Sequence, residues 1–172
     1  DGMGSGRSAA FESRLVVKLF RRLISSGMRC DAAVRLINAV MLTKSKEESF
    51  ATLDALLIDL DNGGMTVIKS GAAATVIRRG RDVIRISTTT FPVGISEKSE
   101  LFTAEQEFGT GDIAIMFSDG INENEYLFIR ELLLGGDDLK RIVDEICSKA
   151  DRFSPNIRND DITVIGVRIV EN

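Results

Sequence analysis

Histidine and tryptophan are absent from this chain of 172 residues, which has only two cysteines and two prolines. Without histidine, a Ser-His-Asp centre, a Cys-His centre and a histidine-ligated zinc site are all excluded. Cys30 and Cys147 are too few for a disulfide framework or a cysteine-rich zinc site, and they suit a reducing compartment. Any metal ion in this protein must therefore be held mainly by oxygen atoms.

Long apolar runs and an excess of basic residues are also missing. No apolar stretch reaches the ~20 residues that cross a bilayer, and no signal peptide is visible. The net charge of −4 and the pI near 5.0 argue against a nucleic-acid partner. Arg78, Arg79 and Arg81 surround Gly80 and are interpreted as solvated hairpin residues. With 44% hydrophobic residues, the chain is expected to form one domain over residues 1–172.

Local patterns predict two helices near the start of the chain, strands in the middle, and one further helix followed by a last strand. Apolar residues four apart from Phe11 to Leu23 indicate a buried helix face, with Gly27 as its C′ residue. Asp31 is expected to cap a second helix that packs antiparallel on the first. Strands are predicted at Phe50–Leu60, Met65–Ser70, Ala74–Arg79, Val83–Ser87, Leu101–Phe108, Ile113–Phe117 and Ile162–Val170, and a further helix at Asp138–Ala150.

The short links between these strands contain glycine and predict antiparallel connections. Gly109–Gly111 is interpreted as the turn of one more hairpin, between the strands that end at Phe108 and begin at Ile113. Strands grouped between helices predict an α+β fold in which helices pack on antiparallel sheets.

Three turns of the chain carry aspartate. They are Asp1-Gly2-Met3-Gly4, Ser118-Asp119-Gly120 after an apolar run, and Asn159-Asp160-Asp161 before another. Each alone is typical of an ordinary turn, because aspartate bonds its own backbone and glycine supplies positive φ. Together they can bring distant carboxylates to one sheet edge, where Mg²⁺ or Mn²⁺ would find the oxygen ligands they require. A site with two metal ions that activates water is one hypothesis from this pattern.

Several separated stretches resemble one known family and span nearly the whole chain. They are DGMGSG at Asp1–Gly6, the helical stretch Ser8–Ser26, FATLDALLIDL at Phe50–Leu60, KSGAAATVIRRG at Lys69–Gly80, FPVGI at Phe91–Ile95, GDIAIMFSDGI at Gly111–Ile121 and NDDITVIGVRI at Asn159–Ile169. In this order and spacing they resemble the PPM (PP2C-type) metal-dependent serine/threonine phosphatases of bacteria. Within that family, the likeness is greatest to the phosphatase domain of stage II sporulation protein E.

The resemblance implies a fold and a set of ligands. The fold would be an α-β-β-α sandwich of antiparallel sheets flanked by helices, with two Mn²⁺ or Mg²⁺ ions at one end of the sheets. Asp1 would bridge both ions and the carbonyl of Gly2 would bind the first, while Asp119 and Asp160 would bind the second. Asp161 would act outside this ligand set, or would exchange roles with Asp160 if the turn is shifted. Because Met3 occupies the place where eukaryotic relatives often have histidine, no general acid is assigned.

The resemblance also implies a function. The chain would hydrolyse phosphoserine on an anti-anti-sigma factor during sporulation, on the cytoplasmic side of a membrane that it reaches only through other regions. Homodimers are an additional expectation. Three alternatives remain open: a stress-response phosphatase of the same family, a catalytically silent PP2C-like regulatory or binding module, and a phosphoacceptor receiver domain, which the missing alternation of strands and helices disfavours.

The beginning of the sequence adds one expectation about this chain itself. No strand precedes the Asp1 turn, so the chain is interpreted as an N-terminally truncated domain that lacks its first strands. We therefore expect Asp1–Gly6 to be displaced or disordered, Asp119 and Asp160 to stay together at their strand ends, and at most one ion to bind weakly there. The chain by itself would then be nearly inactive.

Overall fold

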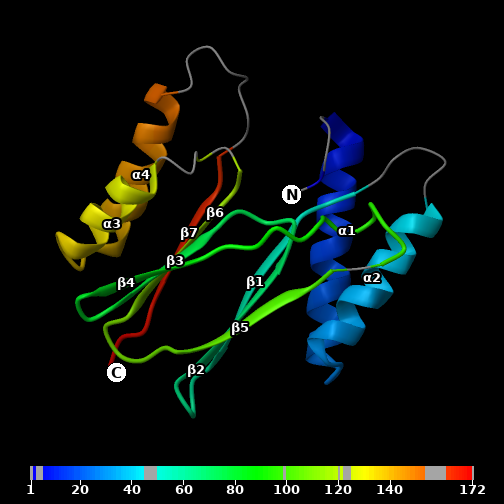
Figure 1. Cartoon of the computed structure of the whole chain (residues 1–172), viewed down its shortest axis with the longest axis horizontal. Helices are drawn as coiled ribbons and strands as arrows, with labels where there is room; N and C mark the ends of the chain where they lie inside the picture. The colour runs from blue at the N-terminus through cyan, green and yellow to red at the C-terminus, as the bar shows by residue number, and fades with distance from the viewer. Residues whose placement is uncertain are drawn as a thin grey trace. The chain divides into compact units, whose positions relative to one another are not determined.

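The computed structural model describes residues 2, 6–44, 50–98, 100–119, 121, 125–153 and 162–171. Figure 1 shows the course of the chain. In chain order the elements are α1 (Gly6–Ser25), α2 (Cys30–Lys44), β1 (Leu53–Asp59), β2 (Gly64–Ser70), β3 (Thr75–Arg79), β4 (Asp82–Ile86), β5 (Phe102–Glu107), β6 (Ile113–Phe117), α3 (Tyr126–Leu134), α4 (Leu139–Phe153) and β7 (Val164–Arg168). The α+β class predicted from the sequence is confirmed.

The chain forms two compact units, and each combines helices with a sheet. The first consists of Asp1–Leu57, Thr66–Ala72 and Thr88–Glu105, and the second of Ile58–Met65, Ala73–Ser87 and Gln106–Asn172. The sheet order β1-β2-β5 describes the three-stranded sheet, most of which belongs to the first unit. The four-stranded sheet of the second unit has the order β4-β3-β6-β7.

In the first unit, α1 and α2 lie side by side and run in roughly opposite directions, as predicted (Figure 1). Val16 and Phe20 of α1 and Val34 and Ile37 of α2 share one apolar core with residues of the strands. The predicted C′ residue Gly27 has a φ of 85°. The amides of Gly27 and Met28 donate to the carbonyls of Ile24 and Leu23, which is the Schellman pattern that ends a helix.

The second helix starts two residues earlier than a cap at Asp31 implies. Because α2 begins at Cys30, Asp31 lies in its first turn. The Asp31 carboxylate accepts from Arg29 and from Arg35, at 3.2 and 2.9 Å. These two guanidinium groups, Arg29 first, lower the pKa of Asp31 below its ordinary value. Asp31 thus takes part in exposed ion pairs at the start of the helix.

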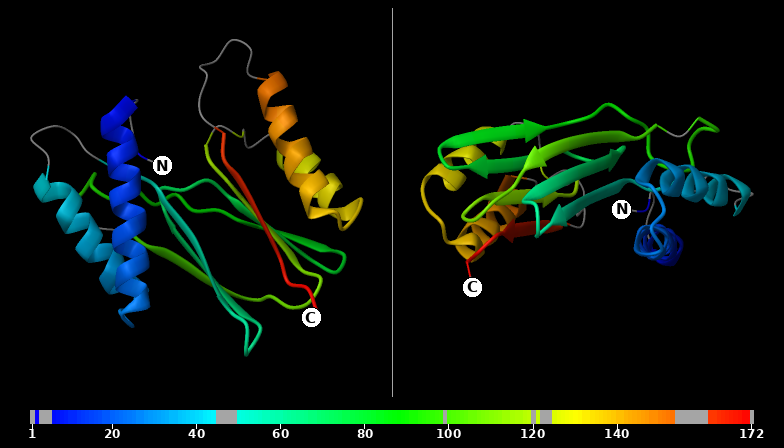
Figure 2. Two further views of the ribbon diagram at one scale, coloured as in Figure 1. Left: turned by 180° about the vertical axis from the view of Figure 1, so that it is seen from behind. Right: turned by 90° about the horizontal axis from the view of Figure 1, so that it is seen from below.

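In the second unit, α3 and α4 cover one face of the four-stranded sheet (Figures 1 and 2). All neighbouring strands of this sheet are antiparallel. The central strands β3 and β6 are buried along almost their whole length, and their apolar side chains pack with Ile129, Leu133, Ile142 and Ile146 of the two helices. A receiver domain needs a parallel sheet with alternating helices, so this antiparallel order rules out that alternative.

Two predictions about the elements are wrong. The hairpin across Gly109–Gly111 does not form, because β5 pairs in the three-stranded sheet and β6 in the four-stranded sheet. The link is a crossing between sheets, which a turn sequence cannot reveal. Helix α3 was not predicted, because its sequence YLFIRELLL is short and nearly continuous in apolar residues, and Glu125 makes no side-chain capping bond.

The prediction that all three hairpin arginines are solvated is also wrong. Arg78 is buried, with an exposed fraction of 8%. Its guanidinium donates to the carbonyls of Gly111, Leu133 and Gly136, at 3.0 to 3.2 Å, and pairs with Asp137. Arg78 therefore ties the end of α3 and the turn before β6 to β3.

Candidate functional site

Asp119, one of the predicted ligands, lies where the central strand β6 leaves the four-stranded sheet. Residues Ile113–Met116 are buried, and Asp119 is exposed in the turn that follows. A strand that is packed on both sides and bonded to two neighbours is a rigid support for the residue at its end. The carboxylate is therefore presented to solvent from a well-held position.

The pairing of β6 with β7 places the start of β7 beside this strand end. Phe117 is the register partner of Val164. One step further, the Ser118 amide donates to the Thr163 carbonyl and the Thr163 amide donates to Ser118 Oγ, each at 3.0 Å. This clamp joins the SDG turn to the sequence that leads into β7. Asp160 and Asp161 precede Thr163 in that sequence and lie outside the described residues.

Gly2, the predicted carbonyl ligand, is buried in the first unit. It forms an isolated antiparallel bridge with Ala51, and Ala51 exchanges two backbone hydrogen bonds with Val93, at 2.9 and 3.0 Å. A Cβ atom on Gly2 would lie 2.2 Å from the carbonyl oxygen of Ala9 in α1. Only glycine fits between the helix backbone and Ala51, so the position of this backbone segment is closely constrained. Asp1 lies outside the described residues.

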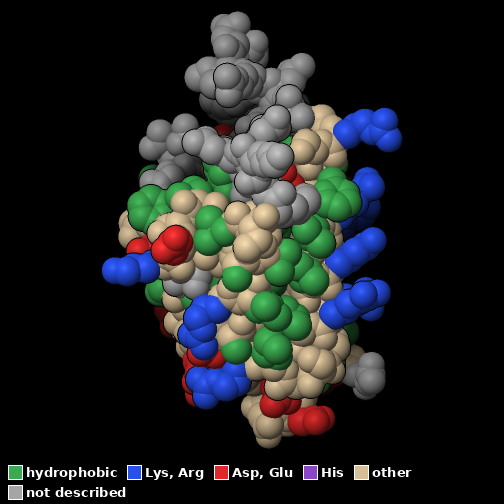
Figure 3. Space-filling view, turned by 90° about the vertical axis from the view of Figure 1, so that its right-hand side faces the viewer, with side chains coloured by type: hydrophobic (Ala, Val, Ile, Leu, Met, Phe, Trp, Pro, Cys, Tyr) green, Lys and Arg blue, Asp and Glu red, His purple; other side chains and the backbone are tan. Residues whose placement is uncertain are grey.

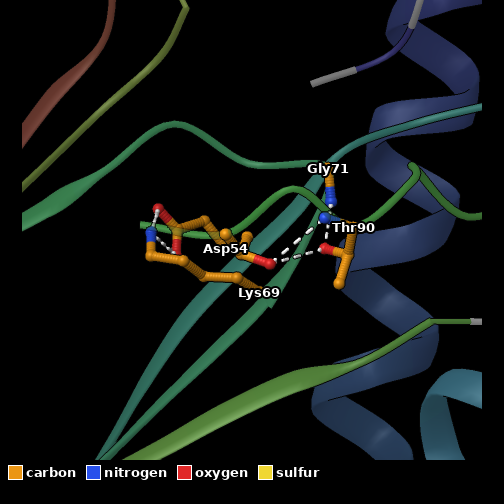
Figure 4. Close-up of polar contacts among 5 residues, drawn as sticks. Asp54, Lys69, Gly71 and Thr90 are labelled. Atoms are coloured by element: carbon orange, nitrogen blue, oxygen red, sulfur yellow. Dashed lines mark hydrogen bonds and ion pairs between the residues drawn. The ribbon is translucent and has the colours of Figure 1, made fainter. Parts of the chain in front are cut away.

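A buried ion pair lies in the first unit, and sequence reasoning missed it (Figure 4). Lys69 Nζ donates to both carboxylate oxygens of Asp54, at 2.8 Å each. The Lys69 side chain is fully buried and that of Asp54 is 17% exposed. Asp54 lies in β1, within the strand predicted at Phe50–Leu60. The one available signal was a lysine inside the otherwise apolar strand MTVIKS.

Burial controls the ionisation of this pair. It raises the pKa of the Asp54 carboxyl, and the Lys69 ammonium offsets part of that rise. It also lowers the pKa of Lys69, with Asp54 acting in the opposite direction. For both groups the cost of leaving water therefore exceeds the attraction of the partner.

The loop at 88–93 is attached to the end of β2, next to this pair. Ser70 Oγ donates to the Phe91 carbonyl at 2.8 Å, and the Gly71 amide donates to Thr90 Oγ1 at 3.1 Å. Val93 then joins Ala51, which in turn holds Gly2. The Asp54–Lys69 pair is thus part of the framework around the backbone segment that carries Gly2.

The described residues contain only part of the predicted ligand set. Within them, no group of three or more His, Cys, Asp or Glu side chains could hold a metal ion. Asp119 and Gly2 are the two predicted site residues with a described position, and they belong to different units. No helix in the described part of the chain is long and apolar enough to span a membrane.

Comparison with known proteins identifies close relatives. A family model described as stage II sporulation protein E (SpoIIE) matches residues 1–170. The protein of that name from Bacillus subtilis (strain 168) is 31% identical over 180 residues, which cover 100% of this chain and 22% of the relative. The chain therefore spans about a fifth of the length of that protein.

Solved structures show the same likeness. The PP2C phosphatase domain of Bacillus subtilis SpoIIE, with a fragment of its regulatory domain, has a TM-score of 0.83 and 31% identity, covering 98% of this chain and 52% of that one. The phosphatase domain of the same protein, presoaked with Mn, has a TM-score of 0.65 and 27% identity, covering 91% and 74%. The chain belongs to the stage II sporulation protein E family, and its fold is that of the PP2C phosphatase domain, as the motifs predicted.

Proposed function

We propose that residues 1–172 belong to the phosphatase domain of a metal-dependent protein serine/threonine phosphatase. The observation that carries this proposal is the placement of Asp119 at the exposed end of a buried central strand, in a chain that belongs to the SpoIIE family. The substrate that we propose is phosphoserine on an anti-anti-sigma factor in sporulation, hydrolysed on the cytoplasmic side of the membrane. The SpoIIE membership favours this substrate over that of a stress-response phosphatase.

The ligands that we propose are the carboxylates of Asp1, Asp119 and Asp160 and the carbonyl of Gly2, with Asp161 just outside this set. Their chemistry fits Mn²⁺ or Mg²⁺, because all the donors are oxygen atoms and the chain has no histidine. The narrow space between Gly2 and Ala9 supports a backbone ligand at that position. A Mn-presoaked relative makes Mn²⁺ the first ion to test.

Each group of the chain then has a defined task. When two divalent ions are bound, they supply a water activated near neutral pH and neutralise the charge of the phosphate monoester. The three carboxylates would supply the negative charge that holds the ions, and the β6–β7 clamp keeps Asp119 beside the start of β7. Electrostatic positioning of this kind supplies most of the catalysis in phosphoryl transfer.

Release of phosphate from p-nitrophenyl phosphate tests the proposal. A chain that contains residues 1–172 within the complete phosphatase domain is expected to turn over this substrate only when Mn²⁺ or Mg²⁺ is added. Ca²⁺ serves as a control, since it is larger and takes more ligands at longer distances. The silent-module alternative predicts no metal-dependent turnover, although the folded domain remains intact by circular dichroism.

Replacing Gly2 by alanine is expected to raise the Mn²⁺ concentration for half-maximal turnover by about tenfold. The added Cβ would collide with the Ala9 carbonyl, so the backbone segment that carries Gly2 must move. Gly109→Ala is the matched control, because a Cβ at Gly109 meets nothing within 4 Å. Titration of turnover with Mn²⁺ measures both variants. An unchanged metal requirement in Gly2→Ala would remove Gly2 from the ligand set.

A further inference from the structure

Helix α1 has a strongly basic exposed surface. Arg7, Arg14, Lys18, Arg21 and Arg22 are all exposed, and together they are named the basic face of α1. At 100° per residue these five positions fall within an arc of about 100°, and they extend over about 22 Å of the helix. The one acidic residue of the helix, Glu12, is buried with an exposed fraction of 7%. No exposed carboxylate of α1 itself therefore neutralises this face.

A second surface helix of the same chain shows the usual arrangement. In α4, Lys140 pairs with Asp144 and Arg141 pairs with Glu145, both at i,i+4 spacing. None of the ion pairs recorded between described residues includes a member of the basic face. Exposed like charges on one helix face repel each other, and here no recorded internal ion pair offsets that repulsion.

Packing determines which side of α1 faces outward. Val16 and Phe20 are buried in the core of the first unit, so the helix cannot turn its basic face inward. Figure 3 looks onto the side of the molecule where α1 and α2 lie, and Lys and Arg side chains form a column along its right-hand edge. Two apolar residues of α1 are also exposed, Phe11 at 55% and Val17 at 58%.

We propose that the basic face of α1 docks this protein onto an anionic lipid bilayer. A straight row of cations fits an extended, flat surface of negative headgroups, and each cation near such a surface adds to binding. Exposed aromatic and aliphatic side chains beside the row suit the headgroup boundary. The chain as a whole has a net charge of −4, so the sum of its charges does not favour an anionic surface, and the basic face of α1 would determine the orientation.

A bilayer fits this face better than an acidic protein does. The core of a specific protein interface is depleted of charged residues, because each charge must be paired and desolvated in fixed geometry. Cations occupy the whole length of this face, and Phe11 lies among them. Mobile lipid headgroups can approach each cation without such a geometric requirement.

Sedimentation of the chain with vesicles tests the proposal. Vesicles of 70% phosphatidylcholine and 30% phosphatidylglycerol are compared with pure phosphatidylcholine at low salt. We expect binding to the anionic vesicles only, and its loss in 0.5 M NaCl because the charges are screened. The double variant Arg14→Gln/Lys18→Gln is expected to weaken partitioning about 25-fold, at about fivefold for each cation removed.

The matched control is Lys140→Gln/Arg141→Gln, which removes the same charge from α4. It is expected to change partitioning by less than about threefold, since those cations lie outside the basic face. Equal weakening by the two double variants would overturn the proposal in favour of a net-charge effect. Equal binding to neutral vesicles, or no vesicle binding at all, would also overturn it. Binding to soluble poly-L-glutamate without vesicle binding would show that this face recognises acidic protein.

Discussion

Asp119→Asn is expected to lower metal-dependent turnover of p-nitrophenyl phosphate by about two orders of magnitude, without loss of the fold. Asparagine keeps the size of the side chain but removes the negative charge that we propose holds a divalent cation. The strand that carries it is buried and bonded on both sides, so the change is confined to the exposed turn. Initial rates at saturating Mn²⁺, with thermal unfolding on the same samples, measure the effect.

Asp82→Asn is the matched control for this variant. Asp82 is an exposed carboxylate of the same unit, at the start of β4, and is not a member of the proposed site. Its replacement is expected to leave turnover within about twofold of the parent, as for most surface substitutions. Near-parental turnover of Asp119→Asn would remove this residue from the site. Equal losses in both variants would indicate an effect of general charge.

Lys69→Met is expected to lower the free energy of unfolding by about 3 kcal/mol or more. Methionine fills a similar volume, but Asp54 would remain largely buried without its cation. The apolar double variant Asp54→Leu/Lys69→Met is expected to stay within about 1 kcal/mol of the parent, because removing both charges also removes their desolvation cost. Denaturant unfolding at pH 7 gives both values.

The pKa directions of this pair support the expected difference in stability between the single and the double variant. The pKa of Asp54 is raised in the folded state. The contribution of this group to stability is therefore present at a pH below its ordinary pKa, and it is lost as the pH rises through its folded-state pKa. The pKa of Lys69 is lowered, so its contribution grows only as pH rises through its own folded-state value. Near neutral pH both charged forms are disfavoured by burial. A double variant as unstable as Lys69→Met would show that the pair contributes net stability.

Regular spacing made the helices and strands of this chain predictable in most places. The four-residue spacing from Phe11 to Leu23 predicted α1, and glycine at 27 predicted its end. Short runs of β-branched and aliphatic residues, separated by glycine, predicted each strand to within a few residues. Helix α3 was missed because a short apolar run has no distinct period, and its N-cap lacks a side-chain bond.

Sheet membership was less predictable than the strands themselves. A turn such as Gly109–Gly111 indicates that a strand ends, but the next strand can pair with any compatible edge. β5 and β6 therefore entered different sheets despite their short link. Arg78 is a similar case, since a hairpin arginine is solvated unless other elements bring carbonyl groups around it, as α3 does here.

By itself, the sequence determined the chemistry that this protein can use and the local position of its motifs. The absence of histidine and the shortage of cysteine restrict any metal site mainly to oxygen donors, and the apolar run before Asp119 places that carboxylate at a strand end. The period of α1 likewise collects its cations on one side of the helix. These properties depend only on residue types and on the spacing of residues that are close in sequence, and both can be read from the sequence.

Only the tertiary structure decided which distant residues meet and which are removed from water. Ser118 lies beside Thr163 because β6 and β7 pair as antiparallel strands. Gly2 is confined because the backbone of Ala9 and the bridge to Ala51 leave no room for a side chain. Lys69 became a buried ion-pair partner because Asp54 lies opposite it within the first unit. Such contacts join residues that are far apart in sequence, and each depends on the free energy of the whole packed arrangement and not on local preference.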